Sequence, residues 1–287
     1  NEYERMKKLG VKWFRAMGGA RDTFSWSYVE HKEGEWRWDE NTLNHPAQKE
    51  FRMLAWLNTV PPRFGGGYDI KSVNGHYDEW EEYVFQTISR YRDRVKHWEV
   101  WNEPSWDSAV YSKLMKRTAR AARRADPEAK VIGFGGFSHA NMLDNILGYK
   151  RHFETTLDAA GMDSMDAVSI HGYYVARPEE NWWPLSQRLS YLRAEMRKRG
   201  KVMPIWDSEI CETVEMFYTD RIDGTDNQWN RGDTGAGMDD PEVGLLGKTL
   251  PPREAANWMA QTLAVYLAHG CEKLFYHFNM CAGGLLM

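Results

Sequence analysis

Short apolar runs alternate with longer amphipathic stretches along almost the whole chain, and this alternation limits the fold more than any other feature. The runs are rich in Val, Ile and aromatic residues, which is typical of strands buried on both faces. Apolar stripes at helical spacing separate several of them. Such an order predicts an α/β fold with parallel strands and right-handed crossovers. The seven predicted strands are Val11–Ala16, Arg52–Asn58, Lys96–Glu103, Lys130–Gly136, Ala167–Tyr173, Val202–Glu209 and Glu272–Phe278, and the three clearest helices are Asp78–Arg94, Leu185–Met196 and Ala255–Tyr266.

Two architectures fit this order, an open doubly wound sheet and a closed (β/α)8 TIM barrel. A barrel needs eight strands, and residues Asn1–Gly10 resemble the end of a helix that leads into the first visible strand. If the chain is a barrel, we expect it to be incomplete at the N-terminus, with strands two to eight visible and open edges at Val11 and Glu272. We expect one catalytic domain over residues 1–287, with a long loop at 212–251 that either lies over the active site or forms a surface insert.

Composition narrows the function classes. A net charge of −4 argues against a surface that binds nucleic acid. No apolar run approaches the ~20 residues that span a membrane, so no membrane partner is expected. The three cysteines and nine histidines show no metal-site spacing, so we expect neither a metal nor another cofactor. The glycines at Gly133–Gly136 match a dinucleotide-binding loop only weakly and more plausibly give backbone room near a substrate.

Two strands end in carboxyl groups, and their positions suggest chemistry. Glu103 closes the apolar run that begins at His97, and Pro104 then breaks the strand, while Glu209 closes the run Pro204–Glu209. Carboxyl ends of parallel strands meet at one face of the sheet, where α/β enzymes build their sites. Glycoside cleavage needs one protonated carboxyl for the leaving oxygen and one ionised carboxylate for the cationic sugar carbon. Taken singly, a strand-end glutamate is more often a solvated or salt-bridged side chain, and it is the pair with its flanking pattern that favours a function.

At this point the sequence resembles the retaining clan A glycoside hydrolases, a (β/α)8 superfamily with catalytic glutamates at the ends of strands four and seven. It is most like family 39, with families 5 and 42 as neighbours. If the first visible strand is strand two, Glu103 ends strand four and Glu209 ends strand seven. The residues that carry the resemblance are Arg15, Phe24–Ser27, Glu33–Asp39, Trp98–Pro104, Gly133–Gly136, His171–Tyr173 and Glu209.

The resemblance implies a role for each matched residue. Glu103 would be the general acid and then the general base, with a pKa raised by burial and by the nearby nucleophile. Glu209 would be the nucleophile, kept ionised by hydrogen bonds from Arg15 and Tyr173. Asn102 would bind the 2-hydroxyl of the sugar, and His171 would support these groups. The further candidate substrate contacts are Trp26, Trp56, Trp101 and Trp206, each of which could instead pack inside the barrel, and Tyr276, on the strand where family 5 usually carries a tryptophan.

The sequence therefore predicts a retaining glycoside hydrolase that cleaves β-linked polysaccharide or oligosaccharide by double displacement, with carbohydrate as its partner. A catalytically inactive carbohydrate-binding protein and a transglycosylase are the alternatives. Neither the sugar, the choice between exo and endo action, nor the oligomeric state follows from the sequence. A secreted or periplasmic location is slightly favoured over a cytoplasmic one.

Overall fold

Seven parallel strands form a nearly closed barrel, an incomplete (β/α)8 TIM barrel as predicted. The computed structural model describes residues 6–15, 23–39, 49–104, 107–136, 143–172, 183–210 and 252–276. Each strand pairs in parallel with the next strand in the sequence, so the spatial order is the chain order. The strands are β1 (Trp13–Arg15), β2 (Arg52–Leu57), β3 (His97–Val100), β4 (Lys130–Gly133), β5 (Ala167–His171), β6 (Ile205–Ile210) and β7 (Lys273–Tyr276).

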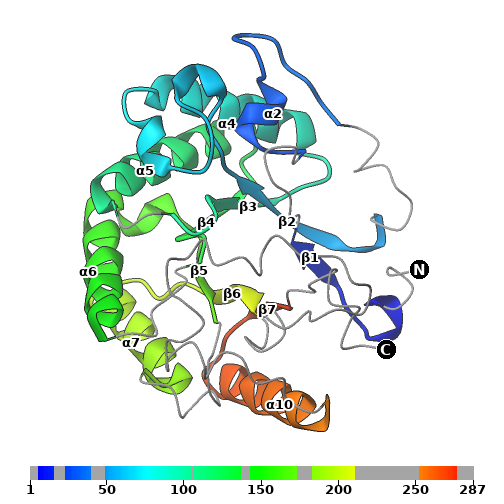
Figure 1. Cartoon of the computed structure of the whole chain (residues 1–287), viewed down its shortest axis with the longest axis vertical. Helices are drawn as coiled ribbons and strands as arrows, with labels where there is room; N and C mark the ends of the chain where they lie inside the picture. The colour runs from blue at the N-terminus through cyan, green and yellow to red at the C-terminus, as the bar shows by residue number, and fades with distance from the viewer. Residues whose placement is uncertain are drawn as a thin grey trace, which may run out of the picture.

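The large helices form an outer arc that runs around the strands from α4 and α5, through α6 and α7, to α10 (Figure 1). This arrangement follows from the alternation of strands and helices, because each crossover returns the chain to the same end of the barrel. The α-helices are α2 (Trp26–Val29), α4 (Tyr77–Tyr91), α5 (Ser108–Ala125), α6 (Leu143–Ala160), α7 (Leu185–Lys198) and α10 (Pro252–Ala268), and the 3-10 turns are η2 (Pro62–Phe64), η3 (Ile70–Val73) and η4 (Met162–Ser164).

Helix α5 illustrates how local sequence sets an element and its packing. The side chain of Asp107 caps the helix by accepting the N–H of Val110 at 3.0 Å. On its buried face, Thr118 accepts a hydrogen bond from the indole of Trp80 on α4 at 2.9 Å. The cap fixes where α5 begins, and the bond between the two helices sets how α5 lies against its neighbour.

The open edges of the sheet are β1 and β7, as predicted. Within the described residues, no backbone pairing joins these two strands. They nevertheless lie close together, since the rings of Trp13 and Phe275 are 6.4 Å apart and the Lys273 ammonium lies 4.8 Å from the Trp13 ring. Side chains therefore close the gap that backbone hydrogen bonds leave.

Two apolar layers hold the strands. The larger layer lies between the sheet and the helices and contains buried residues such as Leu57, Trp98 and Val100. The smaller layer fills the barrel interior, and we call it the barrel floor. It consists of Trp13, Leu54, Ile132, Ala167, Trp206 and Phe275, with the ring of His97 packed against the two tryptophans at 4.7 and 5.5 Å.

Two strands end three residues earlier than the sequence predicts. The strand expected over Lys96–Glu103 ends at Val100, and the strand expected over Lys130–Gly136 ends at Gly133. Trp101, Glu103 and Phe134 adopt φ values of 67°, 46° and 78°. Such left-handed backbone cannot continue a strand, so hydrophobicity alone overestimates the strand length. The predicted loop at 212–251 lies outside the described residues.

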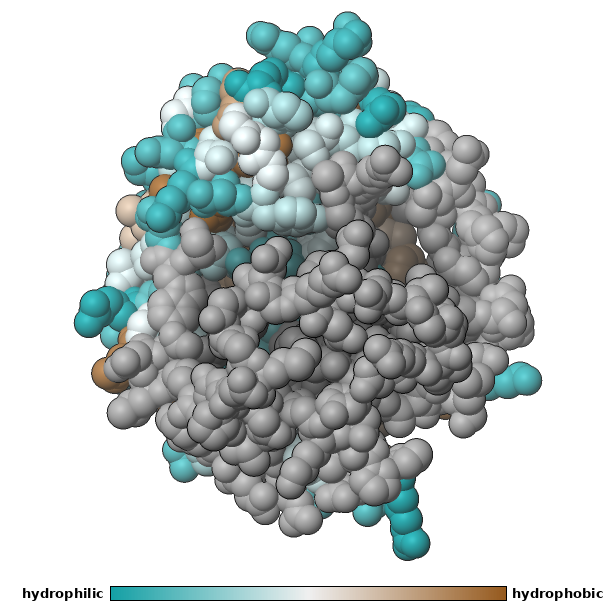
Figure 2. Space-filling model, in the orientation of Figure 1, coloured by the Kyte–Doolittle hydropathy of each residue, from teal (hydrophilic) through white to brown (hydrophobic). Residues whose placement is uncertain are grey.

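On the face of the molecule seen in Figure 2, the described side chains are mostly hydrophilic, with apolar ones scattered among them. Within the described part of the chain, no helix combines the length and the apolar character needed to cross a membrane.

Candidate active site

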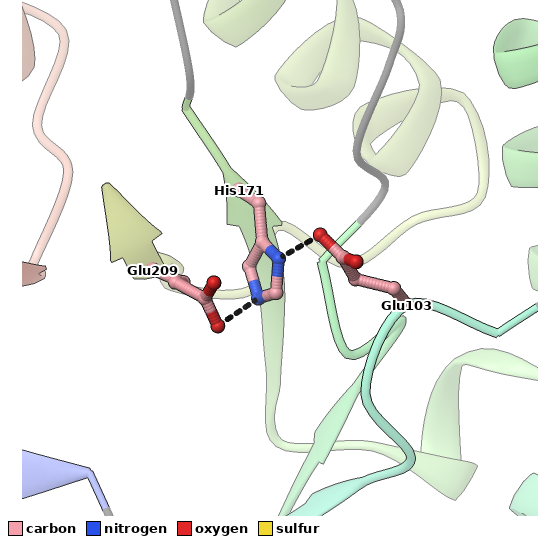
Figure 3. Close-up of side chains that lie close together, drawn as sticks. All are labelled: Glu103, His171 and Glu209. Carbon is pink, nitrogen blue, oxygen red and sulfur yellow. Dashed lines mark hydrogen bonds and ion pairs between the residues drawn. The ribbon is translucent and has the colours of Figure 1, made fainter. Parts of the chain in front are cut away.

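Glu103 and Glu209, the glutamate pair, lie at the carboxyl ends of β3 and β6 and face each other across the ring of His171 (Figure 3). His171 Nδ1 lies 2.9 Å from Glu103 Oε1, and His171 Nε2 lies 4.0 Å from Glu209 Oε2. One carboxylate oxygen of each glutamate and one nitrogen of His171 all lie within 4.8 Å of one another. The structure therefore brings together three side chains that lie up to 106 positions apart in the sequence.

Arg15, at the end of β1, ties the site to the rest of the barrel through three hydrogen bonds. Its guanidinium donates to Glu99 Oε2 at 2.6 Å, to Glu209 Oε2 at 2.6 Å and to Asn102 Oδ1 at 2.7 Å. Burial acts to lower the pKa of Arg15, but the negative charges of Glu99 and Glu209 outweigh burial and raise it. Arg15 is therefore a fixed positive charge that orients one member of the glutamate pair.

A bulge in β6 turns Glu209 into the barrel. Ile170 of β5 pairs with Asp207, but the next residue, His171, pairs with Glu209, so the register shifts by one residue. Side chains two apart on a regular strand point to the same face, whereas a bulge re-aims the second one. Asp207 accordingly contacts Tyr266 of the outer helix α10, while Glu209 contacts Arg15 of β1.

Glu103 is held by a strained turn rather than by a strand. Its backbone N–H donates to the carbonyl of Gly135 at 2.8 Å, and its φ of 46° is rare for a residue with a side chain. A Cβ at Gly135 would lie 2.2 Å from the carbonyl oxygen of Trp101, and one at Gly136 would lie 1.9 Å from the His171 ring. The glycines after β4 therefore provide the backbone room that the sequence suggests, and the His171 ring fills part of it.

Glu99 belongs to the site, and sequence reasoning does not identify it. Its side chain is completely buried in β3, and only its Oε2 is paired, with Arg15. The signal available in the sequence is a charged residue in the middle of an apolar strand, four positions before Glu103. A buried carboxylate of this kind needs a cation, and Arg15 supplies it.

Asp207 is a second buried carboxyl that the sequence analysis does not identify. Burial raises its pKa to about 7, although the hydroxyl of Tyr266 and the backbone N–H groups of Gly172 and Glu209 act in the opposite direction. It lies directly behind the glutamate pair, between β5, β6 and α10.

The predicted aromatic contacts occupy different places. Trp56 lies beside the site, with the Arg15 guanidinium 4.5 Å from its ring. Trp206 lies in the barrel floor, where its indole donates to Glu272 at 2.8 Å. Trp26 is buried outside β2, stacked on Tyr83 at 5.6 Å.

Trp101 is buried against Trp80, with the ring centroids 5.7 Å apart. Trp206 packs inside the barrel, which is the alternative considered for it, whereas Trp26 and Trp101 pack in the larger layer between the sheet and the helices. Tyr276 ends β7 and is half-buried, and Tyr173 lies outside the described residues.

Glu103, His171 and Glu209 also satisfy the distance requirement for a three-ligand metal site. However, the Arg15 guanidinium already contacts the Oε2 of Glu209, and a second cation there would be repelled by this fixed charge. The arrangement consequently suits two carboxyl groups that work as a pair better than it suits a metal ion.

The sequence matches no protein-family model and no curated protein. Solved structures do share the fold. A family 39 glycoside hydrolase from Bacteroides cellulosilyticus superposes with a TM-score of 0.70 at 17% identity, over 96% of this chain and 52% of its own. A family 39 enzyme from Xanthomonas axonopodis gives a TM-score of 0.57 at 14% identity, over 96% of this chain and 54% of its own.

A family 51 α-L-arabinofuranosidase from Bifidobacterium longum gives a TM-score of 0.58 at 14% identity, over 96% of this chain and 60% of its own. The chain thus spans little more than half the length of these structures. At such low identities the likeness establishes the barrel fold that clan A glycoside hydrolases have.

Proposed function

We propose that this chain is the catalytic barrel of a retaining glycoside hydrolase that cleaves β-linked oligosaccharides or polysaccharides. The observation that carries the proposal is the approach of the glutamate pair, one oxygen of each within 4.8 Å, at the carboxyl ends of two barrel strands. Retaining enzymes hold their carboxyl groups about 5–5.5 Å apart, whereas inverting enzymes leave room for a water at about 6.5–9.5 Å.

The surroundings distinguish the two glutamates. Glu209 is the nucleophile in this proposal because Arg15 donates a 2.6 Å hydrogen bond to it and so stabilises the ionised form. Its side chain is 11% exposed, which keeps competing water away from the carboxylate.

Glu103 is the general acid and base. Its side chain is 32% exposed, so a leaving group or a water can reach it. The Nδ1 of His171 can donate to the ionised form or accept from the protonated form, depending on its tautomer. This bond therefore survives when Glu103 changes its role.

The reaction then has two balanced steps. Glu209 attacks the anomeric carbon while Glu103 gives its proton to the departing glycosidic oxygen, which leaves as an alcohol. Glu103 next takes a proton from water, and the resulting hydroxyl displaces Glu209 from the same carbon. The Nδ2 of Asn102, whose Oδ1 is held by Arg15 at 2.7 Å, is free to donate to the 2-hydroxyl of the sugar.

The proposal is tested by hydrolysis of aryl β-glycosides of several sugars by this chain. We expect Glu209→Gln and Glu103→Gln to reduce turnover of activated substrates, Glu209→Gln by about 1,000-fold or more. Glu30→Gln is a matched control, because Glu30 is buried but binds Trp26 and Arg63 away from the glutamate pair. Turnover that is equal in wild type and Glu209→Gln would refute the assignment.

Azide separates the two roles. In Glu209→Gly, azide attacks the substrate directly and should give the α-glycosyl azide, whereas in Glu103→Ala it attacks the covalent intermediate and should give the β-glycosyl azide. The products are distinguished by NMR. Binding of oligosaccharide without any turnover would instead support the non-catalytic alternative, and transfer to added alcohols in preference to water would support a transglycosylase.

A further inference from the structure

Asp207 is a buried carboxyl that the proposed reaction does not use, and its contacts converge on the two segments that carry the site. Its side chain is fully buried. Oδ2 accepts a hydrogen bond from the hydroxyl of Tyr266 on α10. Oδ1 accepts the backbone N–H of Gly172 at 3.2 Å and the backbone N–H of Glu209 at 3.3 Å.

These two N–H groups belong to residues at or next to the site. Gly172 directly follows His171, whose ring contacts Glu103, and the second N–H belongs to Glu209 itself. The register between β5 and β6 shifts at this place, so the regular ladder does not supply all of the usual hydrogen bonds. The Asp207 carboxylate accepts hydrogen bonds from both N–H groups next to this register shift.

We propose that Asp207 is a positioning residue, which with Tyr266 fixes the β6 bulge so that Glu209 faces Arg15 and His171 faces Glu103. The pair anchors the bulge to an outer helix, since Tyr266 comes from α10 and is 2% exposed. The effect of Asp207 on turnover rests on the proposed function, but its effect on the order of the bulge does not. The raised pKa of Asp207 agrees with a carboxyl that is kept in an apolar place for its hydrogen bonds.

The first test removes only the hydroxyl, with Tyr266→Phe. We expect faster hydrogen–deuterium exchange at the N–H groups of Gly172 and Glu209, and a kcat at least about 10-fold lower with KM changed less than about 2-fold. Tyr83→Phe is the matched control, because that buried hydroxyl also donates a hydrogen bond, to the carbonyl of Phe24 outside the barrel. It should lose comparable thermal stability and keep its kcat.

The second test compares Asp207→Asn with Asp207→Ala. The amide of Asn keeps an acceptor for the two N–H groups, so it should restore most of the exchange protection and of the kcat that Ala loses. Exchange and kcat in Tyr266→Phe that match those of Tyr83→Phe would overturn the inference. Exchange needs no turnover, so a chain without glycosidase activity would refute the proposed function while still deciding the role of Asp207.

Discussion

Two successive layers inside the barrel differ sharply in chemistry although the same strands build them. The barrel floor is apolar and aromatic. One strand step further along lies what we call the mouth layer, which consists of Arg15, Glu99, Asn102, Glu103, His171 and Glu209. On β1 the step separates Trp13 from Arg15, and on β3 it separates His97 from Glu99. Two residues of a strand span about 6.6 Å, so packing and chemistry are separated by little more than one side chain.

The difference shows how each layer can be damaged. A side chain of the floor packs mainly through its apolar surface, so its loss removes contact area and leaves a cavity. A side chain of the mouth layer balances charge, so its loss leaves a partner buried without compensation. Substitutions in the floor should therefore lower the unfolding free energy and leave turnover intact, whereas substitutions in the mouth layer should lower turnover as well.

The largest effect is expected from Arg15→Met, which removes the cation shared by Glu99 and Glu209. Because Glu99 is completely buried, the variant should lose about 3–5 kcal/mol of unfolding free energy at neutral pH and almost all turnover. Urea unfolding and the rate of aryl glycoside hydrolysis measure the two effects.

The double variant Arg15→Met/Glu99→Gln is the control. It should regain part of the stability, since the orphaned charge is gone, but it should not regain activity, since Glu209 still lacks its donor. A stability loss below about 1 kcal/mol in the single variant would contradict the view that the mouth layer is an ionic unit.

The next effect concerns Asp207, directly behind the mouth layer. Its pKa rises from 3.8 in the unfolded chain to about 7 in the fold. Between these pH values the unfolded chain has lost a proton that the folded protein keeps, so the unfolding free energy falls as the pH rises from 4 to 7. In Asp207→Asn this loss disappears, and the stability of the variant relative to wild type should rise by about 2–4 kcal/mol across that interval. Parallel stability curves for the two proteins would show that Asp207 does not titrate there.

The two layers also differ in how far the sequence predicts them. Alternation of strands and helices predicts the barrel, and strand-end position predicts Glu103 and Glu209. Glu99 and Asp207 are not found in this way, because a carboxyl inside an apolar strand gives no sign of which strand supplies its partner. The bulge in β6 is also invisible in the sequence, since it depends on pairing with β5. Trp206 and Trp56 both lie within apolar strands, so the sequence does not distinguish them. Only the register of the strands places Trp206 in the floor and Trp56 beside Arg15.

A comparison of Trp206→Phe with Trp56→Phe tests this assignment of the tryptophans. Trp206→Phe should lose about 1–3 kcal/mol of unfolding free energy, through the smaller ring and the lost bond to Glu272, with KM unchanged. Trp56→Phe should raise KM for oligosaccharides more than it lowers stability. Calorimetry and steady-state kinetics on the same preparations check both, and a raised KM in Trp206→Phe would move that residue into the substrate site.

The smallest effect comes from the one titratable ring in the floor. Burial lowers the pKa of His97 to about 4, and the charges of Lys273, Arg52 and Lys130 act in the same direction. As the pH falls from 6.5 towards 4, the unfolded chain binds a proton that the folded protein does not, so stability is lost over this interval. His97 is partly exposed, which limits the loss to about 1–2 kcal/mol.

In His97→Phe, which keeps a ring against Trp13, this loss should vanish while kcat at neutral pH stays unchanged, because the floor contributes packing and the mouth layer contributes charge. Unfolding curves of both proteins at pH 6.5 and 4.5 measure this loss. If the difference in unfolding free energy between wild type and variant is the same at both pH values, His97 is charged inside the floor.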